Sequence, residues 1–260
     1  MKLNYETAGQ KTNPAIILVH GLFGDLDNLK SISRELQSDY FVVNLDLRNH
    51  GQSPWTDSMT FSEMADDLGA LMDTLELEKA HFLGHSLGGK VVMEFSLAYP
   101  KRCISLVVAD IAPVAYDARH THIIDALEQV DLSKIKSRQD ADKQLAAHIS
   151  EPGVRAFLLK NLRKNAAGEW EWRMNLAGLR HCYGDLIGAP TRNGRFVGPV
   201  LFIRGGKSDY VTEAHRDAIA ERFPKAQAKT IADTGHWLHA EKPSVFNGIV
   251  TRFLDEIGSE

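Results

Sequence analysis

The sequence predicts an α/β fold in which helices cover both faces of a mostly parallel, doubly wound sheet. Short apolar runs typical of buried strands alternate along the chain with longer segments whose apolar residues recur at helical spacing. From about residue 116 to residue 195 this alternation stops, and helical segments dominate. We therefore expect a core domain formed by residues 1–115 and 196–260, with a helical insertion at residues 116–195.

The first three expected strands lie before residue 46. The segment before residue 8 alternates as an exposed edge strand does, so we expect the sheet to begin with an antiparallel edge. Between the second and third strands, an apolar face of Leu29, Ile32 and Leu36 predicts a helix, for which Asp27 is a suitable N-cap. The three strands are expected at Lys2–Thr7, Ala15–Val19 and Tyr40–Leu45.

The middle of the core contains two further expected strands separated by helices. Thr60-Phe-Ser-Glu63 has the pattern of a capping box, and the helix that it opens crosses over the sheet. A short apolar run then precedes Ser86, and a helical pattern follows until Pro100. The next buried strand, Ser105–Ala109, ends at Asp110.

Helical segments fill most of the insertion, at about 119–130, 137–149, 154–164 and 175–187. Between the last two of them, the segment from Trp170 to Leu176 alternates, which predicts an extended piece with its apolar side chains on one side. The core then resumes with strands at Val200–Arg204 and Ala228–Ala232, followed by a final helix that Pro243 opens.

Gly84-His85-Ser86-Leu87-Gly88 is a G-x-S-x-G motif at the junction of an expected strand and an expected helix. A serine on so sharp a turn needs small neighbours, because a Cβ at Gly84 or Gly88 would collide with the turn or with the following helix. The strained turn lifts the hydroxyl out of the sheet edge, and the free N–H of Leu87 has a helix dipole behind it. These features indicate that Ser86 is a nucleophile.

Two further segments support a catalytic interpretation of this serine. The strand at Ala15–Val19 ends in His20-Gly-Leu-Phe-Gly24, and His236 follows the last expected strand. A serine hydroxyl is a weak nucleophile at neutral pH and needs a base, which a histidine oriented by a carboxylate supplies. We therefore expect His236 to be the general base, with the acid between serine and histidine in chain order.

With these motifs, the sequence resembles the α/β-hydrolase superfamily over essentially its whole length, and within it the small bacterial esterases of the YbfF type. The resemblance rests on His20-Gly-Leu-Phe-Gly24 and on Gly84-His-Ser-Leu-Gly-Gly-Lys90. It implies an α/β-hydrolase fold, an oxyanion hole formed by the N–H groups of Leu22 and Leu87, and a lid at residues 116–195. The serine argues against the haloalkane dehalogenase and epoxide hydrolase branches, which use a carboxylate nucleophile at the elbow.

Two aspartates stand where this superfamily places the acid of its triad. Asp209 follows the penultimate strand, which is the commoner arrangement, and Asp110 follows the strand after the nucleophile, which is the alternative. Each also has a structural interpretation, Asp209 as a turn residue and Asp110 as an anchor for the loop that enters the insertion. Spacing along the chain permits either, so both remain candidates.

Other polar residues near these strand ends have structural interpretations. We expect the side chain of His85 to diverge from that of Ser86 and to lie in a supporting position, and His20 to hold its own loop. In the loop from Asp46 to Ser53, Arg48 and His50 are the members that we keep as possible substrate contacts. The favoured role of that loop is to hold neighbouring loops together.

Composition and charge narrow the class of partner. With a net charge of −4 and a pI near 6.3, the protein lacks the net positive charge that would attract nucleic acid. No apolar run approaches the roughly 18 residues of a membrane span, and no apolar signal core begins the chain, so we expect a cytoplasmic protein with Cys103 and Cys182 reduced. His236-x-x-His239 and His120-x-His122 lack the partner residues of a zinc site, so we expect no metal and no cofactor.

The expected reaction is the hydrolysis of small-molecule acyl esters or acyl-CoA thioesters, in which Ser86 forms an acyl-enzyme that water then cleaves. The alternatives are a non-hydrolytic lyase resembling the menaquinone-pathway enzymes of this fold, a C–C bond hydrolase, or a binding module that has lost turnover. The set of serine, histidine and acid favours an enzyme over a binding module but separates hydrolase from lyase poorly. The acyl length, the alcohol and the oligomeric state are left open.

Overall fold

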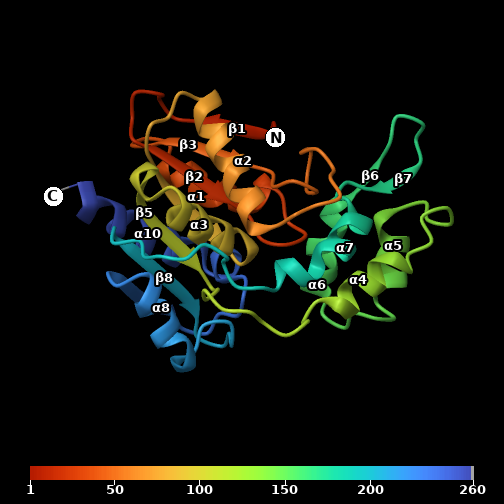
Figure 1. Ribbon diagram of the computed structural model, residues 1–260. Helices are drawn as coiled ribbons and strands as arrows, with labels where there is room; N and C mark the ends of the chain where they lie inside the picture. Colours follow the sequence, from red (N-terminus) through yellow and green to blue (C-terminus); the bar gives the residue numbers. More distant parts are fainter. Residues whose placement is uncertain (259–260) are drawn as a thin grey trace.

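The computed structural model describes residues 1–258 and is built around a seven-stranded sheet (Figure 1). Its strands are β1 (Tyr5–Ala8), β2 (Ala15–Val19), β3 (Phe41–Leu45), β4 (Ala80–His85), β5 (Cys103–Ala109), β8 (Val200–Gly205) and β9 (Ala226–Ile231). They lie in the order β1-β3-β2-β4-β5-β8-β9. β1 pairs antiparallel with β3, and the remaining neighbours pair in parallel. The predicted α/β class and its antiparallel edge are confirmed.

Two layers of helices cover this sheet. The core helices are α1 (Lys30–Leu36), α2 (Phe61–Thr74), α3 (Leu87–Ala98), α8 (Arg216–Arg222), α9 (Leu238–Glu241) and α10 (Pro243–Gly258). Alternate residues of a strand face opposite layers, and in β2 Ile16 belongs to the cluster of α1 and α10 whereas Ile17 belongs to that of α2 and α3. The buried β2, β3, β4 and β5 are apolar on both faces for this reason.

The helical insertion, residues 116–195, lies between β5 and β8 in the chain and beside the core in space (Figure 1). It contains α4 (Thr121–Glu128), α5 (Arg138–Leu145), α6 (Pro152–Leu158), β6 (Leu162–Lys164), β7 (Trp170–Trp172) and α7 (Leu176–Leu186). Its apolar side chains, such as Leu145, Leu158 and Trp172, form one continuous cluster with those of the α2 and α3 layer. The insertion therefore shares its core with the sheet domain.

One predicted helix of the insertion is wrong in its second half. The helix expected at 154–164 ends at Leu158, and a short 3-10 turn leads into β6, which pairs antiparallel with β7. The side chain of Asn165 accepts hydrogen bonds from the N–H groups of Ala167 and Glu169, and Gly168 has a φ of +81°. These contacts close a hairpin, so the extended piece predicted from Trp170 has a partner strand that we did not expect.

Two further details of the core differ from expectation. The N-cap of the segment that leads into α1 is Asp25, not Asp27, since the Asp25 side chain accepts from the N–H of Asp27 and a 3-10 turn, Leu26–Leu29, precedes the α-helix. The sequence analysis also contained no helix between β8 and β9, where α8 lies. Neither difference moves a strand end.

Candidate active site

The sharp turn between β4 and α3 places the side chain of Ser86 at the carboxyl edge of the sheet. Its backbone has φ 53° and ψ −117°, a region that L-residues rarely adopt. A Cβ at Gly84 would lie 2.2 Å from the carbonyl oxygen of Gly88, and one at Gly88 would lie 2.2 Å from that of Val19. The two glycines thus let the strand, the helix and β2 approach one another around the serine.

His236 forms hydrogen bonds to two other sequence-predicted site residues. Its Nε2 lies 2.9 Å from the Oγ of Ser86, and its Nδ1 lies 2.8 Å from an Oδ of Asp110. A carboxylate accepts, so Nδ1 carries the proton and Nε2 is left to accept the hydrogen bond of the serine hydroxyl. The side chain of Asp110 is fully buried, whereas that of His236 is 19% exposed, toward the pockets described below.

The two candidate aspartates have different surroundings. Asp110, which follows β5 with a φ of 52°, also accepts hydrogen bonds from the N–H of Gly205 at 2.9 Å and from the hydroxyl of Ser208. Asp209 has a side chain that is 73% exposed and forms an ion pair with Arg119 at 2.7 Å. The structure therefore brings Asp110 to His236 and turns Asp209 toward the insertion.

Leu22 and Leu87 present free backbone N–H groups beside the serine. Leu87 is the first residue of α3, where an N–H has no acceptor within the helix. Among the described residues, no hydrogen-bond acceptor is found for the N–H of Leu22 either. Both residues line the same pocket as Ser86. This arrangement suits an oxyanion hole.

Two buried histidines hold the loop that carries Leu22. The Nε2 of His50 accepts the N–H of Phe23 at 3.1 Å, and the Nε2 of His20 accepts the N–H of Leu47 at 3.1 Å. Burial lowers the pKa of His50 to about 3 and also lowers that of His20, so both rings stay neutral and keep an acceptor nitrogen. The supporting role expected of His20 agrees with its contact. His50, which we kept as a possible substrate contact, holds the same loop instead, and neither pocket at Ser86 includes it.

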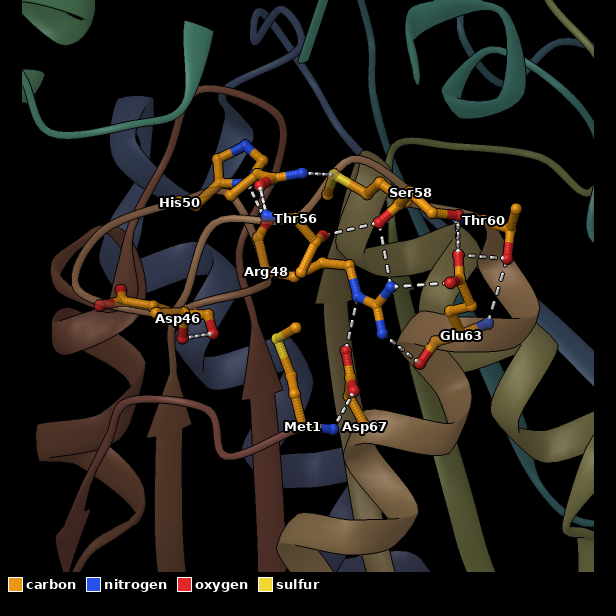
Figure 2. Close-up of polar contacts among 12 residues, drawn as sticks. Met1, Asp46, Arg48, His50, Thr56, Ser58, Thr60, Glu63 and Asp67 are labelled. Atoms are coloured by element: carbon orange, nitrogen blue, oxygen red, sulfur yellow. Dashed lines mark hydrogen bonds and ion pairs between the residues drawn. The ribbon is translucent and has the colours of Figure 1, made fainter. Parts of the chain in front are cut away.

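Arg48 is held in a buried ion-pair network with Asp67 and Glu63 (Figure 2). Its Nε lies 2.8 Å from an Oδ of Asp67, and its Nη1 contacts the carboxylate of Glu63 at 3.2 Å and the carbonyl oxygen of Ser58 at 3.0 Å. Its side chain is only 8% exposed. A structural role therefore explains Arg48, and neither pocket at Ser86 includes it.

His85 points away from the serine and supports the loop of His236. Its Nε2 lies 2.8 Å from the backbone carbonyl oxygen of His236, and its ring centroid lies 4.3 Å from that of His239. Burial lowers the pKa of His85 well below its ordinary value, so the neutral ring donates to that carbonyl.

Within residues 1–258, no group of three or more His, Cys, Asp or Glu side chains is arranged to hold a metal ion.

Ser86 lies where two pockets meet. The first, called the Leu87 pocket, is lined by Leu22, Leu87, Lys90, Tyr116 and Tyr210 among others. The second, called the His236 pocket, is lined by Leu22, His236 and the apolar side chains of Val154, Phe157 and Trp237.

This fold and these motifs match a known family, since residues 14–141 fit the family described as alpha/beta hydrolase fold. Over 98% of its length the chain is 42% identical to the whole of the esterase YbfF of Escherichia coli. The chain belongs to the α/β-hydrolase family. This hydrolase is also 37% identical to the mouse sn-1-specific diacylglycerol lipase ABHD11. The match covers 95% of this chain and 82% of the mouse protein. It superimposes on a marine microorganism esterase with a TM-score of 0.94 and 36% identity, covering 97% of this chain and 99% of the other.

The sequence analysis missed several residues that surround this site in the hydrolase. Ser208 donates to Asp110, the ring of Tyr210 stacks on that of His236, and Lys90 lies in the wall of the Leu87 pocket. Ser208 and Tyr210 flank Asp209 after β8, where we considered only the carboxylate, as a candidate acid. The available signal for these two residues was their position in a loop at the carboxyl edge of the sheet, and for Lys90 it was its position one turn after Ser86 on α3.

Proposed function

We propose that this chain is a serine esterase that hydrolyses acyl esters through an acyl-enzyme on Ser86, with His236 as general base and Asp110 as the triad acid. The observation that carries the proposal is the continuous hydrogen-bonded set from Ser86 through His236 to Asp110. The relatives described above are esterases and a diacylglycerol lipase, which supports a carboxylic ester hydrolase. Asp209 is not part of this proposed triad.

In the proposed first half-reaction, the Nε2 of His236 takes the proton of Ser86 as its Oγ attacks the ester carbonyl carbon. The carbonyl oxygen becomes an oxyanion, which the N–H groups of Leu22 and Leu87 stabilise by about 3 to 4 kcal/mol each. The imidazolium then gives its proton to the departing alkoxide, so an alcohol leaves and the acyl group stays on the serine. Asp110 stabilises the imidazolium and fixes its orientation.

In the second half-reaction, a water molecule replaces the alcohol. His236 removes one proton from the water as its oxygen attacks the acyl-enzyme, and the tetrahedral intermediate again places its charge at Leu22 and Leu87. Collapse of the intermediate returns the proton to Ser86 and releases a carboxylic acid.

We assign the two ends of the ester to the two pockets. The leaving oxygen receives its proton from His236, so the alcohol belongs on the side of the His236 pocket, with its apolar Phe157 and Trp237. The acyl group then extends into the Leu87 pocket, next to the proposed oxyanion donor. The insertion contributes to both pockets, through Tyr183 and Phe157, which supports a lid role for residues 116–195.

Acyl-CoA thioesters are a second proposed substrate class, because attack of a serine on a thioester uses the same residues. The complete triad geometry favours turnover over a binding module. The esterase and lipase relatives support ester hydrolysis over the lyase and C–C hydrolase alternatives. We also propose a cytoplasmic location, since both cysteines of the chain are free and buried. Within the described residues no helix is long and apolar enough to cross a membrane.

The proposal is tested with p-nitrophenyl acetate, p-nitrophenyl butyrate and butyryl-CoA on the wild-type protein and on Ser86→Ala. We expect release of p-nitrophenol by the wild type and loss of nearly all of it in the variant. A fluorophosphonate should add one adduct, to the peptide that contains Ser86. Equal labelling or equal hydrolysis in Ser86→Ala would contradict the proposal, and hydrolysis of the p-nitrophenyl esters without butyryl-CoA would remove only the thioester class.

A further inference from the structure

The segment Ser208-Asp209-Tyr210, which follows β8, contacts three different parts of the candidate site. The hydroxyl of Ser208 donates to the carboxylate of Asp110, and the carboxylate of Asp209 pairs with Arg119 of the insertion. The ring of Tyr210 stacks on the imidazole of His236, with centroids 3.9 Å apart and planes 22° from parallel. One tripeptide therefore connects the proposed acid, the proposed base and the insertion.

The stacked ring of Tyr210 restricts a motion of His236 that its two hydrogen bonds do not prevent, namely a tilt of the imidazole plane. Two hydrogen bonds fix the imidazole nitrogens in the plane of the ring, but they resist a tilt of that plane only weakly. An aromatic ring at 3.9 Å fills the space on one face and opposes such a tilt. A small displacement matters, because the Nε2 must stay within hydrogen-bond distance of Ser86 during proton transfer.

Several contacts fix Tyr210 itself. Its carbonyl oxygen accepts a hydrogen bond from the hydroxyl of Tyr116, and its own hydroxyl lies 3.3 Å from the Nε2 of His120. The guanidinium carbon of Arg119 lies 4.7 Å from the centroid of its ring, a cation–π distance, and Asp209 holds Arg119 there at 2.7 Å. The Tyr210 ring is thus held by residues at the start of the insertion as well as by its own loop.

The imidazole of His120 and the hydroxyl of Tyr210 stay uncharged near neutral pH, whereas the guanidinium of Arg119, which also contacts Tyr210, carries a positive charge. Burial lowers the pKa of His120 to about 4, and burial raises the pKa of Tyr210 above its ordinary value. A neutral imidazole and a neutral phenol place no charge against the imidazolium that forms at His236. The stacked phenol is therefore suited to orienting the ring of His236 without adding a charge of its own.

We infer that Tyr210 is a positioning residue, whose aromatic ring holds His236 in line with Ser86 and Asp110, and that Asp209 acts on this site only indirectly, through Arg119. The inference rests on the proposed role of His236 as the base. It also gives Asp209 a function other than that of triad acid. The ring is the essential part, whereas the hydroxyl links the ring to His120 of the insertion.

The test compares Tyr210→Leu with Tyr210→Phe, using p-nitrophenyl acetate because its acyl group is too small to depend on the far wall of the Leu87 pocket. In Tyr210→Leu we expect kcat to fall roughly 10- to 100-fold with little change in KM, since the base is misplaced while the acetyl group still binds. The rate of fluorophosphonate labelling of Ser86 should fall in parallel. Tyr210→Phe keeps the ring and should restore most of both rates.

Two results would overturn the inference: a Tyr210→Leu protein with unchanged kcat, or a Tyr210→Phe protein that loses as much as the leucine variant. If Tyr210→Leu does not fold, as thermal unfolding would show, Tyr210→Phe alone decides, because a stacked ring without its hydroxyl must still support turnover. Ser86→Ala is measured alongside. Activity in that variant would contradict the proposed function, whereas an inactive Ser86→Ala beside a fully active Tyr210→Leu would remove only the role of Tyr210.

Discussion

Ser86 keeps its backbone at φ 53° and ψ −117°, where a side chain is crowded by its own main chain. Residues held in such sparsely populated regions destabilise a fold by about 1 to 3 kcal/mol, and they persist where the surroundings fix them. Here the strand β4 and the helix α3 fix the turn, and the result is a hydroxyl that meets His236 at 2.9 Å. The turn between β4 and α3 therefore causes the backbone strain and also positions the hydroxyl for its proposed role.

This strain predicts that two inactive variants, Ser86→Gly and Ser86→Ala, differ in stability. Ser86→Gly removes the Cβ that makes the conformation unfavourable, whereas Ser86→Ala keeps it. Differential scanning calorimetry should therefore show Ser86→Gly melting roughly 2 to 4 °C above Ser86→Ala, for about 1 kcal/mol of relieved strain. A glycine variant that melts at or below the alanine variant would show that the turn is not strained.

The choice between Asp110 and Asp209 as the triad acid depends on the direction of each side chain, which the sequence does not show. Both follow parallel strands that lie side by side, so both reach the same edge of the sheet. The direction of each side chain depends on the loop, and the φ of 52° at Asp110 is a property that the sequence does not display. The predictions for Ser86 and Leu87 come from the G-x-S-x-G motif, which has a fixed local geometry. The prediction for His236 comes from its position after the last strand, and that for Leu22 from the resemblance to the family.

At the scale of elements, α3 links the serine to the exit of the insertion. The ammonium group of Lys90 donates to the carbonyl oxygens of Ile187, at 3.0 Å, and of Gly188, just after α7. One turn further along α3, the fully buried carboxylate of Glu94 accepts the N–H groups of Thr191 at 2.6 Å and of Arg192 at 3.1 Å. The helix that begins at the nucleophile thus fixes the segment 187–192.

Glu94→Gln should loosen this segment. Glutamine has one side-chain oxygen instead of two, and its amide group would face donors, so at least one buried charge-assisted hydrogen bond is lost. Hydrogen–deuterium exchange should speed up roughly tenfold or more at the amides of Thr191 and Arg192. Glu221→Gln, at an exposed position on α8, is the matched control. Unchanged exchange at residues 187–192 would mean that Glu94 does not anchor them.

The elements of the core were more predictable than those of the insertion, for a physical reason. Buried parallel strands such as β2 and β5 are apolar on both faces and stand out in any window. The hairpin of β6 and β7 has strands of three residues, and the leucines at 158, 159 and 162 continue the helical spacing of α6 up to its start. Apolar spacing alone does not separate a helix end from a short strand.

At the scale of the whole molecule, buried neutral histidines make stability depend on pH. Burial lowers the pKa of His20, His50, His81, His85, His120, His215 and His239, to about 3 for His50 and to about 4 for His81, His120 and His239. In the unfolded chain these rings titrate near the ordinary 6.5, so between pH 6.5 and about 4 unfolding takes up protons. Their contribution to stability is present above pH 6.5 and is lost as the pH falls.

We therefore expect the melting temperature to change little between pH 8 and pH 7 and to fall steeply from pH 6.5 to pH 4.5. Each such histidine adds about 1.4 kcal/mol per pH unit to the slope in that range. Calorimetry over this range measures the slope directly. A melting temperature that is flat down to pH 4.5 would contradict neutral burial of these rings.

His81 allows one histidine to be isolated, because it lies on β4 away from the two pockets and contacts Ser105 and Tyr40. His81→Gln should reduce the slope near pH 5 by about 1.4 kcal/mol per pH unit. His148→Gln, at an exposed position, should leave the slope as it is in the wild type. An equal effect of the two variants would rule out burial as the cause.

The proposed triad requires three chain segments far apart in sequence to meet at one edge of the sheet, with Asp110 rather than Asp209 behind His236. The most direct measurement is kcat on p-nitrophenyl acetate for Asp110→Asn and Asp209→Asn, each shown to be folded by its thermal unfolding. Asp110→Asn should lose as much as ~10⁴ in kcat, because an asparagine leaves the imidazole in the wrong tautomer, and Asp209→Asn should lose roughly tenfold or less. A folded Asp110→Asn that keeps its kcat within tenfold of the wild type, or an Asp209→Asn that loses ~10⁴, would contradict the triad proposed here.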